Sequence, residues 1–162
     1  NQNHQALADL AVNTTLVNEN LPVLIIGIDK TLVNQRVLHQ QLFEKGALGG
    51  INWVVYVDPE AVNIRIQDIV WLVANNIDPL RDCFYARSGV NIDMPPMAID
   101  GTGKSLSADG FQRQWPNVLV MDDETIRQVD ELWEKLGLGR FIPSPSHHYK
   151  ALVKNEGAVA KG

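Results

Sequence analysis

The 162-residue chain has little cysteine, few aromatic residues and no excess of positive charge. Its single cysteine, Cys83, cannot form an internal disulfide and excludes a metal site built from several cysteines. The net charge of −5 and the lack of a basic stripe with interleaved aromatic residues argue against nucleic acid or an anionic membrane as a partner. We therefore expect a reducing, cytoplasmic setting, with Cys83 as a small core residue of a strand rather than a reactive thiol.

Long apolar runs are also missing from the sequence. The longest, residues 21–28, includes Pro22 and falls far short of the roughly 20 residues that a transmembrane helix needs. The N-terminus lacks the basic and apolar segments of a signal peptide. Hydrophobic residues make up 45% of the chain and charged residues 20%, which is typical of a globular protein. We predict one globular domain without a transmembrane segment.

Alternation of strand and helix patterns dominates the first half of the chain. Apolar, β-branched runs predict strands at residues 21–29 and 52–58, and residues 82–89 are predicted as a third strand. Helices are predicted at residues 30–46, with Thr31 as N-cap and Gly46 as C-cap, and at residues 63–76. The expected inward side chains of these helices are Val33, Val37, Leu38 and Leu42, and then Ile66, Ile69, Val70 and Val73. This order predicts an α/β fold with a parallel sheet and helices on its faces.

Residues 88–114 show no periodicity and are rich in glycine, proline, aspartate and serine. They include Gly103-Lys104-Ser105, which ends like a phosphate-binding P-loop, but Ala98 stands where that pattern needs its first glycine. Pro95 and Pro96 argue against a central strand before the loop. An irregular surface loop is therefore the favoured interpretation. A small nucleotide-dependent enzyme that uses residues 98–105 is the alternative, and we expect no measurable ATP binding.

The two ends of the chain differ in pattern. Residues 1–20 predict a short helix or an irregular arm. After residue 115 the sequence predicts a helix that is capped by Asp122 or Asp123 and closed by Gly137 and Gly139. Its apolar stripe consists of Ile126, Val129, Trp133 and Leu136. In the tail, the side chains expected to be exposed on a monomer, and so to face a partner, are Phe141, Ile142 and Tyr149.

Lys30 is the strongest single candidate for a binding residue. It lies where the first strand ends and the next helix begins, a position that favours an anion such as phosphate. From composition alone a solvated surface lysine is the favoured interpretation, and the anion site is the alternative.

The other polar groups give weaker evidence for a functional site. Asp58-Pro59-Glu60 has the carboxylates of a metal site, but a proline-containing turn is favoured. The adjacent His147 and His148 point apart, and Ser144 and Ser146 have no positioned base, so we predict no metal site and no catalytic residue in this chain.

Five segments in order resemble the C-terminal domain of the UbiD family of prenylated-FMN-dependent decarboxylases. They are LPVLIIGIDKT, WVVYVDPEAVNI, IVWLVANNIDPLRD, AIDGTGK and FQRQWPNVLVMDDETIRQVDELWEKLGLG. By this resemblance Gly103-Lys104-Ser105 is a variant of the family's Asp-x-Thr-x-Lys loop. The chain departs from the family at Asp58-Pro59-Glu60, which replaces a run of aspartates, and at Asn75-Asn76, which replaces a Thr-Arg pair.

The resemblance implies a three-layer α/β/α fold with a mostly parallel sheet. It also implies a parent lyase that decarboxylates an aromatic or α,β-unsaturated acid, for example a hydroxybenzoate precursor of ubiquinone or menaquinone. Residues 1–20 would form an arm or linker helix, residues 21–140 the UbiD-like domain, and residues 141–162 a tail that contacts an oligomer partner.

The family's flavin-binding and catalytic domains lie upstream of this region, so the resemblance makes them the chain's partners, together with further copies of the chain. Lys30 matches the lysine that approaches the flavin phosphate in some family members, and prenylated FMN would be held mainly by the other domains. The chain alone would be inactive. The alternative is a freestanding assembly subunit of a split decarboxylase or carboxylase.

Overall fold

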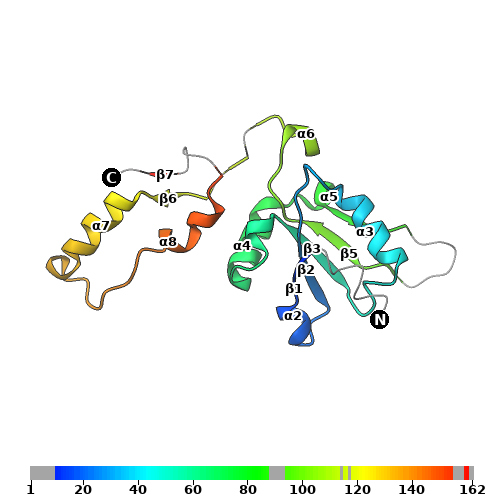
Figure 1. Cartoon of the computed structure of the whole chain (residues 1–162), viewed down its shortest axis with the longest axis horizontal. Coiled ribbons are helices and arrows are strands. Elements are labelled where there is room, and N and C mark those ends of the chain that lie inside the picture. The colour runs from blue at the N-terminus through cyan, green and yellow to red at the C-terminus, as the bar shows by residue number, and fades with distance from the viewer. Residues whose placement is uncertain (1–9, 88–93, 114, 117, 155–158, 161–162) are drawn as a thin grey trace. The chain divides into compact units, whose positions relative to one another are not determined.

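The computed structural model of the chain describes residues 10–87, 94–113, 115–116, 118–154 and 159–160. These residues form two compact units, unit 1 (Asn1–Gln114) and unit 2 (Trp115–Gly162), shown in Figure 1. The domain boundaries that the sequence suggests after residues 20 and 140 stay a prediction. No helix in the described part of the chain has the length and apolar character to cross a bilayer.

Unit 1 is built on a five-stranded sheet with the order β1-β2-β3-β5-β4. Its three central strands, β2 (Val23–Gly27), β3 (Trp53–Val57) and β5 (Met97–Asp100), run parallel. The edge strands, β1 (Ala11–Asn13) and β4 (Cys83–Tyr85), are antiparallel to β2 and β5 respectively. The predicted α/β class with a mostly parallel sheet is confirmed, but the third predicted strand, β4, is an antiparallel edge strand and not a parallel one.

Short and long helices alternate with these strands. They are α2 (Thr15–Asn18), α3 (Gln35–Glu44), the 3₁₀ turn η1 (Pro59–Ala61), α4 (Ile66–Asn76), α5 (Pro79–Asp82) and α6 (Leu106–Asp109). Figure 1 shows α3 and α4 on opposite sides of the sheet. Successive strand residues point to opposite faces, so Leu24 and Ile26 pack in one core with Leu42 of α3. At Gly101, just after β5, an added Cβ would come within 2.7 Å of Val73 of α4.

Strand β5 lies inside the segment that the sequence predicts to be an irregular surface loop. Pro95 and Pro96 precede this strand and do not interrupt it, and a strand tolerates proline at its start. Ala98 is fully buried between β3 and β4. The surface-loop prediction is therefore wrong for Met97–Asp100 and for the buried residues that follow. Residues 88–93 of the same segment lie outside the described residues.

Two predicted boundaries also change. The helix arm expected within residues 1–20 includes strand β1, whose Val12 pairs with Ile26 of β2. Thr31 is not the N-cap of α3, because the Asn34 side chain caps this helix by accepting from the amides of the next turn. Gly46 follows the helix with φ 68°, the left-handed conformation expected of a closing glycine.

Two side chains predicted to face the core are exposed instead. Val37 is 54% exposed and Val70 is 60% exposed, whereas Leu42 and Ile69 are buried as expected. The pattern misses two buried polar residues of these helices, His39 at 0% exposed and Asp68 at 5% exposed.

His39 is buried because each ring nitrogen has a partner. Nδ1 lies 3.0 Å from the Tyr56 hydroxyl, and Nε2 lies 2.9 Å from the Pro96 carbonyl. The carbonyl can only accept, so Nε2 carries the proton and Nδ1 accepts from the hydroxyl. Burial lowers the pKa of His39, which favours this neutral form.

Unit 2 contains the predicted C-terminal helix. Its elements are β6 (Val120–Met121), α7 (Asp123–Leu132), the 3₁₀ turn η2 (Trp133–Leu136), α8 (Ser146–Tyr149), the 3₁₀ turn η3 (Lys150–Leu152) and β7 (Val159–Ala160), which pairs with β6. Asp122 caps α7 by accepting from the Thr125 amide at 2.6 Å, as predicted. Phe141 and Ile142 are exposed at 47% and 64%, as predicted, whereas Tyr149 is half-buried.

Candidate functional site

Charged side chains follow the carboxyl ends of the three parallel strands in unit 1. Lys30 comes shortly after β2, Asp58 directly follows β3, and Asp100 is the last residue of β5. In open α/β sheets this edge is where ligands usually bind. Six charged residues gather around Lys30 and Asp100 and are called the charged cluster below. Its members are Lys30, Arg81, Asp82, Asp100, Lys104 and Asp109.

Asp100 is the centre of this cluster, with a side chain only 3% exposed. Its Oδ1 accepts hydrogen bonds from the Thr102 amide at 3.1 Å and the Thr102 hydroxyl at 2.5 Å, and it lies 3.3 Å from Nζ of Lys104. Its Oδ2 accepts from Nζ of Lys30 at 3.2 Å and from Nε2 of Gln35 at 3.0 Å. Both carboxylate oxygens are therefore saturated with donors, which lets the charge stay buried.

Lys104 is enclosed by the cluster and its side chain is 0% exposed. Its Nζ donates to the backbone carbonyl of Asp100 at 2.7 Å and lies 3.5 Å from Oδ1 of Asp82. Burial lowers the pKa of Lys104, while the charge of Asp100 opposes this shift. Lys104 thus ties the loop after β5 back onto the end of its own strand.

Asp82 joins the cluster from the end of α5. Nε and Nη2 of Arg81 donate to its two oxygens at 2.8 and 2.7 Å, and the Asp78 amide donates at 2.7 Å. Burial alone raises the pKa of Asp82, but the hydrogen bonds from Arg81 and Asp78 and the charge of Lys104 outweigh it, so the net shift is downward. Asp82 is ionised at neutral pH and balances Arg81 and Lys104.

Lys30 is the site residue that the sequence predicts, and the structure places it inside the cluster. Its Nζ lies 2.5 Å from Oδ1 of Asp109 on α6 and 3.2 Å from Oδ2 of Asp100, and its side chain is 7% exposed. The interpretation that composition favours, a solvated surface lysine, is therefore wrong. The other oxygen of Asp109 accepts from the Ser105 amide at 2.8 Å.

The cluster is electrically balanced. Its three cations (Lys30, Arg81 and Lys104) face three carboxylates (Asp82, Asp100 and Asp109), and each cation contacts at least one of them. Buried pairs of this kind fix geometry, and loss of one partner is costly because it leaves an uncompensated charge. Its direct effect is to hold the loop of residues 101–109 over the ends of the strands.

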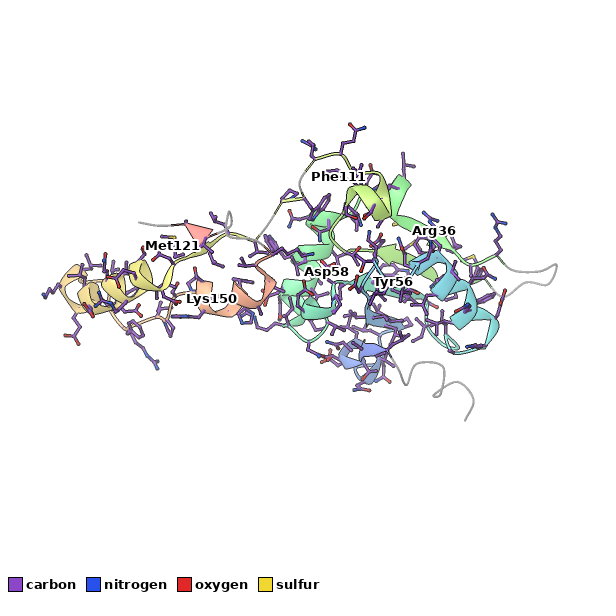
Figure 2. The ribbon with its side chains drawn as sticks, turned by 45° about the horizontal axis from the view of Figure 1, so that its top comes forward. Arg36, Tyr56, Asp58, Phe111, Met121 and Lys150 are labelled. Atoms are coloured by element: carbon purple, nitrogen blue, oxygen red, sulfur yellow. The ribbon has the colours of Figure 1, made fainter. Side chains whose placement is uncertain are left out.

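Asp58, labelled in Figure 2, also holds this loop, because its Oδ2 accepts from the Gly103 amide at 3.0 Å. It directly precedes η1, whose first residue is Pro59, so the predicted proline-containing turn is confirmed. Within the described ranges, no group of three or more histidine, cysteine, aspartate and glutamate residues is arranged to hold a metal ion.

The geometry around Gly103-Lys104-Ser105 differs from a phosphate-binding P-loop. A strand does precede it, contrary to the prediction, since Ala98 lies in β5. However, the Lys104 ammonium points inward onto Asp100, and the following helix α6 has only four residues. Ser105 caps that helix by accepting from the Ala108 amide at 3.2 Å. The loop therefore has a structural role, because its contacts hold it against the end of β5.

The remaining candidates lie apart from the cluster. Cys83 starts β4 and is half-buried, and burial raises its pKa, so the thiol is not activated. In unit 2 the Ser146 hydroxyl accepts from the Met121 amide at 3.0 Å, which is a structural role. His147 and His148 are both exposed on α8.

Sequence reasoning missed five residues that complete the site, which are Gln35, Arg81, Asp82, Thr102 and Asp109. A signal for Thr102 was present, because an Asp-x-Thr-x-Lys spacing lets the carboxylate cap the turn that the lysine closes. For Asp109 no local signal exists, because its partner Lys30 is 79 residues away.

Parts of two longer curated proteins are similar to this chain in sequence. No protein-family model matches the chain. An uncharacterized protein of Archaeoglobus fulgidus is 31% identical over 140 residues, which are 75% of this chain and 29% of that protein. An uncharacterized protein of Aquifex aeolicus is 30% identical over 94 residues, or 52% of this chain and 19% of that protein. The chain thus spans less than a third of the length of these curated relatives.

Solved structures of one enzyme resemble the chain closely enough to bear on its fold. Vanillic acid decarboxylase of Sedimentibacter hydroxybenzoicus, in its open form with a truncated second component, has a TM-score of 0.51 and 16% identity, over 84% of this chain and 31% of that chain. The UbiD-class enzyme HmfF of Pelotomaculum thermopropionicum, in an evolved dimeric form with prFMN, gives a TM-score of 0.43 at 20% identity, over 70% of this chain and 24% of that chain. The likeness to vanillic acid decarboxylase supports a UbiD-like fold for the chain.

Proposed function

We propose that this chain is the C-terminal domain of a UbiD-type carboxy-lyase that acts on an aromatic or α,β-unsaturated acid. The observation that carries the proposal is the likeness to a chain of vanillic acid decarboxylase, which covers 84% of this chain but only 31% of that chain. The sequence resemblance along residues 21–140 adds to it. The proposal includes a three-layer α/β/α arrangement of that domain, an arm in residues 1–20 and a partner-contacting tail in residues 141–162.

In this proposal the chain closes the substrate pocket and contributes to oligomer contacts, but it performs no catalysis alone. The flavin-binding and catalytic domains of the parent hold prenylated FMN, which supplies the electron-accepting ring for decarboxylation. The charged cluster supports such a role, because its members pair with one another and hold a loop over the strand ends. A hydroxybenzoate on a route to a quinone is one substrate that fits this class.

Lys30 is the proposed contact to the flavin phosphate. Its position after β2 fits this role, but in the present conformation Nζ is bonded to two carboxylates and the side chain is 7% exposed. A contact between Lys30 and a phosphate therefore requires one carboxylate to leave. No other cofactor contact is proposed for this chain.

The test is an intact mass and flavin analysis of the protein that carries this sequence in its native source. We expect a polypeptide well above the 18.0 kDa of this chain, with prenylated FMN bound. A species near 18.0 kDa that copurifies with a separate flavin-binding polypeptide would favour the alternative, a split decarboxylase or carboxylase in which this chain is an assembly subunit. A native protein that contains no flavin and has no flavin-binding partner would contradict both.

A further inference from the structure

We propose that the groove between helix α3 and the outer edge of strand β4 binds an extended, acidic segment of a partner polypeptide as an added strand. Strand β4 is the last strand in the order β1-β2-β3-β5-β4. The groove has a volume of about 720 Å³, and its lining includes Arg36, Phe84, Tyr85 and Arg87. Such a segment would bind whether or not the chain belongs to a decarboxylase.

The main-chain groups of Tyr85 face away from the sheet. Tyr85 pairs with Met97 of β5, and the Met97 amide donates to the Asn52 carbonyl on the opposite side, toward β3. Tyr85 and Met97 therefore form one of the antiparallel pairs that exchange no hydrogen bonds, which directs the Tyr85 amide and carbonyl outward. Because Tyr85 is 55% exposed, an incoming strand can reach these two groups.

The next outward position of this edge already holds an amide group. Arg87 lies two residues after Tyr85, and its main chain faces the Gln40 side chain of α3. Nε2 of Gln40 donates to the Arg87 carbonyl at 3.1 Å, and the Arg87 amide donates to Oε1 of Gln40 at 2.7 Å. A peptide backbone pairs with an antiparallel neighbour by the same exchange of two bonds. The partner segment would continue this pairing from Gln40 to Tyr85.

The charges around the edge favour an acidic partner. Arg36, labelled in Figure 2, lies with its guanidinium carbon 4.3 Å from the centre of the Phe84 ring. Among the described residues, neither Arg36 nor Arg87 forms an ion pair with a carboxylate. Glu44 also lines the groove, and it accepts from Nε2 of Gln40 at 2.8 Å. Two arginines without acidic partners, in a chain of net charge −5, are complementary to carboxylates.

The same charges argue against a second copy of this chain as the partner. Two β4 edges that paired with each other would bring Arg36 and Arg87 of both copies to one interface, where like charges repel. The exposed Val37 and Tyr85, at 54% and 55%, instead give an acidic segment apolar contacts beside the arginines. In strand addition the main-chain bonds supply affinity and the alternating side chains supply specificity.

A short peptide of alternating glutamate and valine residues is the probe. It is titrated into the isotope-labelled 162-residue chain, and the backbone amide resonances are followed by NMR. We expect saturable shifts at Tyr85 and Arg87. A peptide of the same sequence that is methylated on every backbone nitrogen should not bind, because it cannot donate to the edge. A peptide with lysine in place of glutamate should not bind either.

Replacement of Arg87 by glutamate tests the charge. R87E should weaken binding of the glutamate peptide at least about tenfold. The matched control is Lys45→Glu, which makes the same charge change at an exposed residue that ends the same helix, and it should alter affinity by less than about twofold. Arg87 is preferred to Arg36 for this test, since Arg36 also packs on Phe84.

Replacement of Tyr85 by proline tests the backbone pairing. Proline has no amide hydrogen, but the Tyr85 amide faces away from β5, so the bonds between β4 and β5 remain. The control Tyr85→Ala loses the same side chain and keeps the amide. Y85P should lose at least about tenfold in affinity relative to Y85A. If Y85P does not fold, the comparison of the plain and methylated peptides on the wild type decides the same question.

Three results would overturn the inference. They are a wild type whose Tyr85 resonance does not respond to the glutamate peptide, equal binding of the methylated peptide, and equal effects of R87E and K45E. Shifts at Tyr85 that depend on protein concentration without peptide would show that the edge pairs with a second copy, and they would overturn the acidic partner as well.

Discussion

Replacement of Asp100 by asparagine tests whether the buried charges depend on one another. The amide keeps the size of the side chain but removes the carboxylate between Lys30 and Lys104, whose side chains are 7% and 0% exposed. Loss of one partner of a buried ion pair costs about 3–5 kcal/mol. Since Asp109 and Asp82 remain as partners of the two lysines, we expect a loss in the free energy of unfolding near the lower end, about 3 kcal/mol.

The assay is urea unfolding combined with hydrogen exchange measured on peptides of each unit, because two compact units can unfold separately. The loss of protection should be confined to unit 1, and Asp123→Asn in unit 2 should leave unit 1 unchanged. In a double-mutant cycle, D100N and K104M should be strongly non-additive. A D100N protein within about 0.5 kcal/mol of the wild type would refute the reasoning, since ordinary surface substitutions fall in that range.

The pH dependence of D100N gives an independent check. The pKa of Lys104 is below its ordinary 10.5 because of burial, and loss of the Asp100 charge lowers it further. Between the folded and the unfolded pKa, the unfolded state binds more protons, so stability rises with pH. The deficit of D100N relative to the wild type should therefore shrink as the pH is raised from neutral toward 10.5. A deficit that grows with pH would contradict this assignment.

Three further predictions follow from the packing. Gly101→Ala should lower the free energy of unfolding by about 1–3 kcal/mol through overpacking, whereas Gly49→Ala, whose Cβ would meet its nearest neighbour at 3.6 Å, should be close to neutral in urea unfolding. The urea midpoint should fall as the pH drops below 6.5, because His39 takes up its proton at a higher pH in the unfolded state than in the folded state, where burial lowers its pKa. The variant His39→Gln should flatten this dependence. Replacement of the exposed Phe141 and Ile142 by serine should reduce self-association, and a wild type that sediments as a monomer at high concentration would count against the partner surface.

The sequence predicts the elements with strong local patterns. Strands β2 and β3 are β-branched runs, and α7 has both an apolar stripe and the Asp122 cap, so local propensity and tertiary structure agree. Strand β5 escapes prediction because Met-Ala-Ile-Asp is too short to show a period and follows two prolines. Its burial comes from β3 and β4 on either side, which is a tertiary effect.

The candidate site likewise has one part that local sequence predicts and another that depends on tertiary structure. Lys30 is predictable, because a cation after a central strand faces the ligand-binding edge of an α/β sheet. Its burial and its pairing with Asp109 are not, since 79 residues separate the two. Val70 and His39 show a similar limit, because helical spacing places an apolar side chain inward and a polar one outward unless specific partners reverse the preference.

Decarboxylation measured for the native protein and for the 162-residue chain alone tests the central claim most directly. Carbon dioxide release is measured from cinnamate- and hydroxybenzoate-type acids with prenylated FMN, for the native protein and for the 162-residue chain alone. We predict release by the native protein and none by the chain. Release of carbon dioxide by the chain alone, or a native protein that neither binds the flavin nor decarboxylates any acid of these classes, would contradict the account.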